Sequence, residues 1–294
     1  MKSQSRDLML RGAAQLSQAG LEPARVEAEW LLAHLLGVTP PELYLQEAAV
    51  APETAERFFG WIARRARGTP LQYLTGQAEF FGRVFAVEPG VFIPRPETEA
   101  VIEQALPALR ARQAQAVRPL RLLDLGTGSG CIAVTLASAL PSCLVVGVEV
   151  SWNALSVARR NVRRHGLEGR IQLVQGQWLE PIRGRIDAIV ANPPYVPAAR
   201  VNRLPLDVRQ EPRMSLDGGT DGLRELDFLL RTAPRALQPG GILAMECGEE
   251  QVKPLQRRAY ALGWTTATTV LHDLAGRPRG ILAVAGGRVE QTPL

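Results

Sequence analysis

Hydrophobic side chains recur at helical spacing through the first seventy-odd residues of the chain. Each such run has proline near its start or glycine at its end, as helix boundaries favour. Apolar positions three or four residues apart predict one helix in each run, over residues 8–20, 23–37, 40–45 and 52–68. In the second helix, four apolar side chains are expected to share one face: Val26, Trp30, Leu31 and Leu35. Short loops between short amphipathic helices predict a small all-helical domain over residues 1–75.

The pattern changes between residues 76 and 97. Residues 78–87 alternate loosely in polarity around Gly82, which predicts a β-hairpin. Three prolines between residues 89 and 96 exclude a helix before Pro96, because proline lacks an N–H and fixes φ. We therefore expect a hairpin followed by a rigid, extended connector.

From Thr98 onward, helices alternate with short hydrophobic strands. Strands are expected over residues 121–125, 144–150, 171–175, 187–192, 242–247, 265–271 and 280–286. The helices between them are expected over residues 98–113, 129–140, 151–166, 225–241 and 252–264. This alternation is typical of an α/β fold with a doubly wound, mostly parallel sheet covered by helices on both faces. The α/β domain is expected to span residues 98–294.

Composition is that of a folded protein. The 294 residues are 46% hydrophobic and 21% charged, which excludes wholesale disorder. The net charge of +5 is carried almost entirely by arginine. Residues 1–75 hold 8 basic and 8 acidic side chains, so the whole excess lies beyond them. Arginine suits carboxylate, phosphate and RNA surfaces.

Cysteines and histidines are scattered, without the spacing of metal ligands: Cys131, Cys143, Cys247, His34, His165 and His272. This excludes a zinc cluster and a disulfide framework. The N-terminus lacks the apolar core of a signal peptide, and no stretch approaches the roughly 20 apolar residues of a membrane span. We therefore expect no metal, no membrane association and a reduced, cytoplasmic location.

A glycine-rich turn follows the first predicted strand of the α/β domain. Its candidate ligand-binding residues are Asp124, Gly126, Thr127, Gly128, Ser129 and Gly130. Glycine lets the backbone approach a ligand, and the N-terminus of the next helix offers free amides, so a nucleotide-like cofactor is indicated. The spacing is GxGxG rather than GxGxxG, and the Asp124 carboxylate would repel a pyrophosphate but attract an ammonium group. The turn favours S-adenosylmethionine; a nicotinamide cofactor and an ordinary tight turn are the alternatives.

Two side chains after later strands are candidates for the same cofactor. Glu149 ends the second strand, where a carboxylate can accept hydrogen bonds from both ribose hydroxyls. A solvated glutamate at a strand end is the alternative. Trp178 follows the third strand, and its indole either stacks on adenine or packs in the core.

The fourth strand ends in a short proline-rich loop, Asn192-Pro193-Pro194-Tyr195. The two prolines have no N–H, so only their carbonyl oxygens can bind a ligand. The Asn192 side-chain oxygen and the Pro193 carbonyl are predicted to accept both hydrogens of a planar NH2 group, with Tyr195 as a flat wall beside it. Two fixed acceptors favour positive charge developing on a weakly nucleophilic nitrogen. The loop indicates methylation of an amino group on a base or a carboxamide; a structural turn is the alternative.

Taken together, these residues resemble the release factor glutamine methyltransferase family, the PrmC/HemK type. The resemblance covers about residues 10–285 and rests on seven segments, 70–82, 92–99, 124–133, 190–197, 211–222, 239–248 and 273–280. Among these, RPETE at residues 95–99 and DGGTDGL at residues 217–223 are much more specific than the NPPY loop alone.

The resemblance implies a seven-stranded, Rossmann-like class I methyltransferase fold. It implies transfer of a methyl group from S-adenosylmethionine to the side-chain amide of the glutamine in the GGQ motif of class I peptide chain release factors. Both domains would hold the factor, and a monomer without a stable nucleic acid partner is expected. The residues implied at the cofactor are Gly126 to Gly130, Glu149, Gln177, Trp178 and Asn192. Those implied at the substrate are Asn192, Pro193, Pro194, Tyr195, Phe92 and Arg95, of which Asn192, Pro193 and Tyr195 are catalytic.

Two positions depart from the family pattern. Glu149 stands where aspartate is commoner, and Gln177 stands where an aspartate usually precedes the aromatic residue. A neutral amide accepts a hydrogen bond from the adenine amino group less strongly than a carboxylate does. Gln177 therefore bears on cofactor affinity rather than on reaction type.

Two other functions remain open on the sequence alone. An N6-adenine or guanine-N2 nucleic acid methyltransferase would use the NPPY loop equally well, and four arginines on one predicted helix, at residues 159, 160, 163 and 164, suit it unless they form a solvated face. An enzyme acting on duplex DNA needs a region that stabilises a flipped base, and no insertion resembles one. A non-catalytic S-adenosylmethionine-binding or RNA-binding protein is the other alternative; the intact glycine turn and NPPY loop together argue against it.

Overall fold

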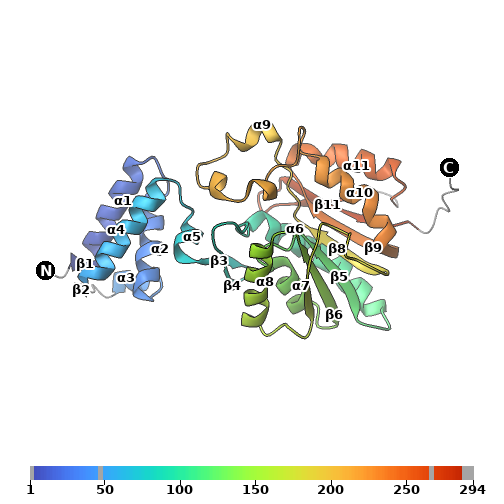
Figure 1. Ribbon diagram of the computed structural model, residues 1–294, viewed down its shortest axis with the longest axis horizontal. Helices are drawn as coiled ribbons and strands as arrows, with labels where there is room; N and C mark the ends of the chain where they lie inside the picture. The colour runs from blue at the N-terminus through green and yellow to red at the C-terminus, as the bar shows by residue number, and fades with distance from the viewer. Residues whose placement is uncertain (1–2, 46–48, 265–267, 287–294) are drawn as a thin grey trace. The chain divides into compact units, whose positions relative to one another are not determined.

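The computed structural model describes residues 3–45, 49–264 and 268–286. The chain divides into two compact units (Figure 1). One unit consists of the residues up to Gln77 together with Leu204–Gln210, and the other contains the rest of the chain. A short piece of the second half of the sequence thus belongs to the N-terminal unit.

The N-terminal unit is helical, as predicted. Its elements are β1 (Ser3–Gln4), α1 (Ser5–Gln18), α2 (Ala24–Leu36), α3 (Glu42–Leu45), β2 (Ala49–Val50), α4 (Pro52–Ala66) and α5 (Leu71–Thr75). The antiparallel β1–β2 ribbon and helix α5 were not anticipated. Helices α1 and α4 approach closely at Gly12, which has no side chain. A Cβ at this position would lie only 2.6 Å from the Phe58 ring. The core comprises Leu8, Leu16, Leu31, Leu32, Phe58 and Ile62, among others.

The apolar face predicted for α2 is only partly confirmed, because Leu31 is buried and Leu35 packs against the core but the other two members are exposed. Val26 and Trp30 are exposed, whereas Ala28, Leu31 and Leu32 are fully buried. Ala28 and Leu32 take part in the core in their place, so the stripe of α2 that faces the core is rotated from the predicted one.

A β-hairpin lies at the start of the second unit, as expected. Strands β3 (Gln77–Phe80) and β4 (Arg83–Ala86) are joined by Phe81 and Gly82, which both have positive φ, at 50° and 65°. Such a two-residue turn matches the twist of the flanking strands. Helix α6 (Pro96–Gln115) begins at Pro96, at the end of the proline-rich connector.

A seven-stranded sheet forms the centre of the second unit. Its strands are β5 (Leu120–Leu125), β6 (Cys143–Glu149), β7 (Ile171–Gln175), β8 (Ile186–Ala191), β9 (Leu237–Glu246), β10 (Thr269–His272) and β11 (Pro278–Val284). They lie in the order β10-β11-β9-β8-β5-β6-β7, and β11 runs antiparallel to both of its neighbours, whereas the other pairings are parallel. The predicted mostly parallel, doubly wound sheet is confirmed. The strand order reverses at β5, where such sheets bind ligands beyond the carboxyl ends of their strands.

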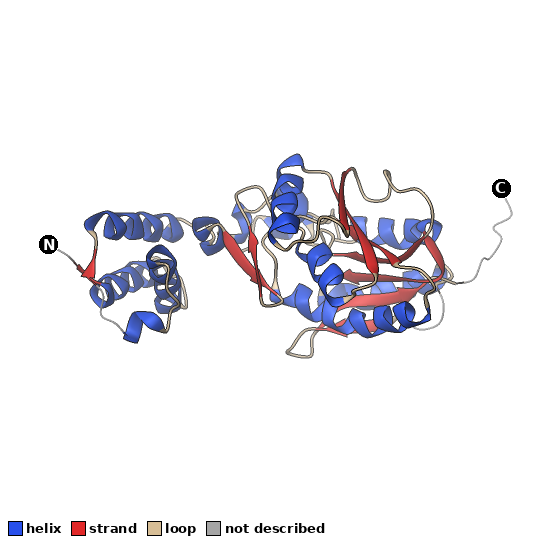
Figure 2. Ribbon diagram, turned by 90° about the horizontal axis from the view of Figure 1, so that it is seen from below, coloured by secondary structure: helices blue, strands red, loops and turns tan. Residues whose placement is uncertain are grey.

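Helices cover both faces of this sheet (Figure 2). One face packs against α6, α7 (Cys131–Ala139) and α8 (Trp152–Arg164). The other packs against α10 (Arg224–Ala236) and α11 (Val252–Ala261). The remaining short helices are α9 (Ala198–Val201), η1 (Val208–Gln210), η2 (Arg213–Ser215) and η3 (Glu249–Gln251).

Two strand predictions differ from the structure. Strand β9 starts at Leu237, five residues before the expected 242, and takes Gly240 through a φ of 71°. The expected strand at 265–271 is seen as β10, and residues 265–267 lie outside the described residues. Within the described ranges, every helix is too short or too polar to cross a membrane.

Candidate active site

The glycine turn lies between β5 and α7. Gly126, Gly128 and Gly130 all have positive φ, at 73°, 54° and 82°, which other residues rarely adopt. A Cβ on Gly130 would lie 3.3 Å from the Cβ of Ala158, so this glycine also lets the turn approach α8. The turn exposes backbone beside the start of α7, as a cofactor site requires.

Asp124 supports this turn from inside the protein. Its carboxylate is buried and accepts hydrogen bonds from the Thr127 hydroxyl and, at 2.9 Å, from the Ala133 amide. Burial raises the pKa of Asp124 to about 7. It was expected to contact the cofactor, but it does not line the cavity described below. These two donors, one in the turn and one in α7, account for its inward orientation.

Glu149 braces the turn from the end of β6. One carboxylate oxygen accepts from the Gly128 amide at 3.0 Å, and the other accepts from the Ser151 amide at 2.8 Å. Each oxygen keeps a second lone pair, so the carboxylate can still accept from two ligand hydroxyls. This acceptor set fits the ribose of S-adenosylmethionine.

Trp178 lies across from the glycine turn. Its ring comes within 3.7 Å of the Cβ position of Gly126, and its Nε1 donates to Glu225 at 2.9 Å. With the N–H paired, the indole is fixed, and a side chain at Gly126 would narrow the space beside it. The indole of Trp178 lines the cavity described below and could hold a flat group such as adenine. Gln177, next to it, is exposed.

Glu149, Trp178 and part of the glycine turn line one cavity of about 490 Å³ at the carboxyl edge of the sheet. The volume suits a nucleotide-sized ligand. The predicted residues that line it are Phe92, Gly126, Thr127, Ser129, Glu149, Gln177, Trp178, Asn192 and Pro194. Predicted residues that do not line it are Asp124, Gly128, Gly130, Pro193, Tyr195 and Arg95.

The NPPY loop follows β8 and brings Asn192 and Pro194 to the cavity. Tyr195 was expected to form a wall of it. Instead the ring packs beside the hydrophobic core, and its hydroxyl donates to Glu246 at 2.9 Å. The buried Glu246 carboxylate at the end of β9 needs a hydrogen-bond donor, and the Tyr195 hydroxyl supplies one.

Asn192 is anchored by a residue that the sequence did not single out. Its Nδ2 donates to the Thr98 hydroxyl at 2.9 Å, and that hydroxyl donates to Glu246 at 2.5 Å. Burial raises the pKa of Glu246 to about 7. Thr98 lies in RPETE and Glu246 in PGGILAMECG. Two of the seven segments that carry the resemblance therefore contribute to the hydrogen-bond network of Asn192.

Residues 211–222 pack against the backbone of the NPPY loop. A Cβ on Gly218 would lie 2.8 Å from the Pro194 carbonyl oxygen, and one on Gly222 would lie 2.3 Å from the Tyr195 carbonyl oxygen. Gln251 donates to that same Tyr195 oxygen at 2.9 Å. Only glycine fits at these two positions, which explains the DGGTDG sequence. This segment and the start of α10 also contribute residues to the cavity that were not predicted from the sequence: Arg213, Met214, Ser215, Asp217, Arg224 and Glu225.

Arg95 does not reach the cavity. It pairs with the buried Glu211 and lies 5.2 Å over the ring of Phe92, which does line the cavity. Glu211 also accepts from the Ile93 amide at 2.9 Å. Arg95 therefore fixes the connector rather than bordering the substrate pocket as expected.

Within the described parts of the chain, no group of three or more histidine, cysteine or acidic side chains is placed to hold a metal ion. The three cysteines are buried and free.

Comparisons with known proteins identify relatives of this chain. A family model described as the PrmC N-terminal domain matches residues 7–76, and one described as the methyltransferase small domain matches residues 98–204. A relative from Moorella thermoacetica named release factor glutamine methyltransferase is 46% identical over 271 residues, which cover 92% of this chain and 94% of the relative. A relative of the same name from Geobacter sulfurreducens is 44% identical and covers 93% of each chain. A crystal structure of a methyltransferase from Pyrococcus furiosus is similar in fold, with a TM-score of 0.50 and 20% identity over 71% of this chain and 91% of that one.

Proposed function

The chain belongs to the release factor glutamine methyltransferase family, and we propose that it methylates the glutamine of the GGQ motif in class I peptide chain release factors. The methyl group comes from S-adenosylmethionine and is transferred to the side-chain amide nitrogen, N5. The family relationship agrees with the resemblance read from the sequence motifs.

The cofactor site is assigned to the half of the cavity that holds the glycine turn. Glu149 would accept from the ribose hydroxyls, the indole of Trp178 would lie along the adenine, and the turn from Gly126 would face the remainder. When bound there, S-adenosylmethionine supplies an electrophilic methyl group on a sulfonium.

The NPPY loop would hold the glutamine amide. Its nitrogen is a weak nucleophile, because its lone pair is delocalised into the carbonyl. The Asn192 Oδ1 and the Pro193 carbonyl would accept its two hydrogens, which favours positive charge on nitrogen as the N–C bond forms. These acceptors also fix the direction of approach. As the N–C bond forms, the bond between the sulfonium sulfur and the methyl carbon would break, with S-adenosylhomocysteine as the leaving group. The nitrogen would then release one proton to water to give the neutral N-methyl amide, so no strong base is needed before transfer.

One observation carries this proposal: Asn192 lies in the same cavity as Glu149 and Trp178, with its amide nitrogen already engaged by Thr98. Its oxygen is therefore left as an acceptor beside the cofactor residues.

The test is mass spectrometry of a release factor, and of a free GGQ peptide, after incubation with the protein and isotope-labelled S-adenosylmethionine. A single added methyl on the GGQ glutamine supports the proposal. Label on total nucleic acid and none on the factor would instead favour a base methyltransferase.

We propose that the N-terminal helical unit docks the release factor. Its core forms among its own residues, so its exposed side chains, Trp30 and Val26 among them, are available to a partner. We also propose that the protein acts as a monomer in the cytoplasm, where class I release factors work, and that it keeps no stable nucleic acid partner.

A further inference from the structure

A chain of hydrogen bonds leads from the NPPY loop into the protein. The carboxylate of Glu246, at the end of β9, is buried. One of its oxygens accepts from the Thr98 hydroxyl at 2.5 Å and the other accepts from the Tyr195 hydroxyl at 2.9 Å. The Thr98 oxygen in turn accepts from Asn192 Nδ2 at 2.9 Å.

The direction of these bonds follows from the hydrogen inventory. A threonine hydroxyl has one hydrogen, and a carboxylate can only accept. The Thr98 hydrogen is therefore committed to Glu246, so its oxygen can only accept from Asn192. The amide nitrogen of Asn192 must face Thr98, and Oδ1 must face away from it.

We propose that Glu246 is a positioning residue, acting through Thr98 to hold the Asn192 side-chain oxygen toward the substrate amide. This inference rests on the proposed function. A side-chain amide turned by 180° has nearly the same shape but presents NH2 in place of oxygen. Turned that way, Asn192 would present a donor to the substrate NH2 group, which is itself a donor.

Protonation of Glu246 would weaken this constraint. The pKa of Glu246 is raised to about 7, chiefly by burial and also by the nearby Glu97; hydrogen bonds from Thr98 and Tyr195 and the charge of Arg279 oppose this rise. Below that pH the protonated carboxyl can donate to Thr98, whose own hydrogen is then free to turn toward Asn192. Turnover should rise with pH through about 7 and level off above it.

Thr98→Val is the decisive variant, because valine keeps the shape and removes the hydroxyl. With saturating cofactor and GGQ peptide, we expect kcat to fall roughly 10- to 100-fold, with a smaller change in KM. The rise of kcat near pH 7 should also disappear. Asp124 has a pKa near the same value and is intact in this variant, so loss of the rise identifies Glu246. Thr98→Ser, which keeps the hydroxyl, should restore both kcat and the pH profile.

Calorimetric measurement of the affinity for S-adenosylmethionine checks that each variant is folded. If the valine variant does not fold, Thr98→Ala replaces it in both measurements. A valine variant with the wild-type kcat and pH profile would overturn the proposal.

A second readout does not depend on the substrate. In isotope-labelled protein, the Asn192 side-chain NH2 signal, assigned by its loss in Asn192→Ala, should shift and exchange faster in Thr98→Val but not in Thr98→Ser. An unchanged signal in the valine variant would overturn the positioning role. If the wild type leaves the GGQ glutamine unmethylated, the proposed function fails, and this measurement still decides whether Thr98 fixes the Asn192 amide.

Discussion

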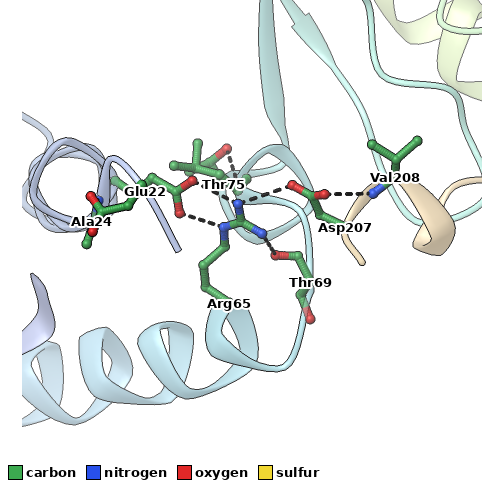
Figure 3. Close-up of polar contacts among 9 residues, drawn as sticks. Glu22, Ala24, Arg65, Thr69, Thr75, Asp207 and Val208 are labelled. Atoms are coloured by element: carbon green, nitrogen blue, oxygen red, sulfur yellow. Dashed lines mark hydrogen bonds and ion pairs between the residues drawn. The ribbon is translucent and has the colours of Figure 1, made fainter. Parts of the chain in front are cut away.

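Replacing Arg65 by methionine tests how the helical unit holds the distant segment 204–210. The Arg65 side chain, on α4, is only 6% exposed. It donates to Glu27 at 2.6 and 2.8 Å, to Asp207 at 3.1 Å and to the Thr69 carbonyl at 3.4 Å. Figure 3 shows Arg65 with Thr69 and Asp207. One guanidinium thus joins α2, α4 and a segment from the second half of the sequence.

The expected loss of stability follows from burial. Removing one partner of a buried ion pair costs about 3–5 kcal/mol, because the remaining charge stays desolvated. The side chains of Glu27 and Asp207 keep 16% and 31% exposure, so water partly replaces the lost partner. We therefore expect Arg65→Met to lower the free energy of unfolding by about 2–3 kcal/mol. Methionine retains much of the aliphatic packing, so the loss reports mainly on the guanidinium.

Urea unfolding followed by far-UV circular dichroism measures this loss. The matched control is Arg64→Met, which removes an exposed arginine next to Arg65 on the same helix and should change stability by less than about 0.5 kcal/mol. Equal effects of the two variants would refute the reasoning. Affinity for S-adenosylmethionine should stay unchanged in both, because all residues lining the cavity belong to the other unit.

Three further predictions concern the site and the helical unit. Asn192→Ala should abolish methyl transfer with cofactor binding mostly intact, a loss of roughly 2.7–4 kcal/mol in transition-state stabilisation; methylation within about threefold of wild type would contradict the assignment. A chain of residues 76–294 should fold, bind the cofactor and lose far more activity on the intact factor than on a free GGQ peptide; equal loss on both would mean that the helices only stabilise. Gln177→Asp should tighten S-adenosylmethionine binding by about 0.5–1.5 kcal/mol in calorimetry at one pH, and unchanged or weaker binding would show that Gln177 does not face adenine.

Local patterns predicted the fold well, because each element carries its own boundary signals. Helix α6 begins at Pro96 since no earlier residue of the connector can start a helix, and the glycine turn has the positive φ values that its glycines indicate. The buried face of α2 could not be chosen in this way. Both of its faces carry apolar side chains, and which of them is buried depends on how the other helices of the unit pack against α2.

Local patterns could not predict contacts between residues that lie far apart in the sequence. Arg95 has the chemistry of a substrate ligand, but its partner is Glu211, which only the folded chain brings beside it. Glu246 stands at the end of a strand, where a glutamate is usually solvated, and its burial depends on Thr98 and Tyr195 arriving from α6 and the NPPY loop. Tyr195 was misassigned for the same reason, because its hydroxyl partner was unknown.

The specificity of the longer motifs has a physical explanation in this arrangement. An NPPY loop alone places an asparagine at the edge of a sheet but leaves its amide free to turn. Thr98 and Glu246 together fix that amide, and Gly218 is needed because any side chain there would meet the Pro194 carbonyl. Each of these three residues lies in a different motif. A methyltransferase that keeps NPPY but lacks this set needs another means of orienting its asparagine, so the companion motifs carry more information about the reaction than the loop itself.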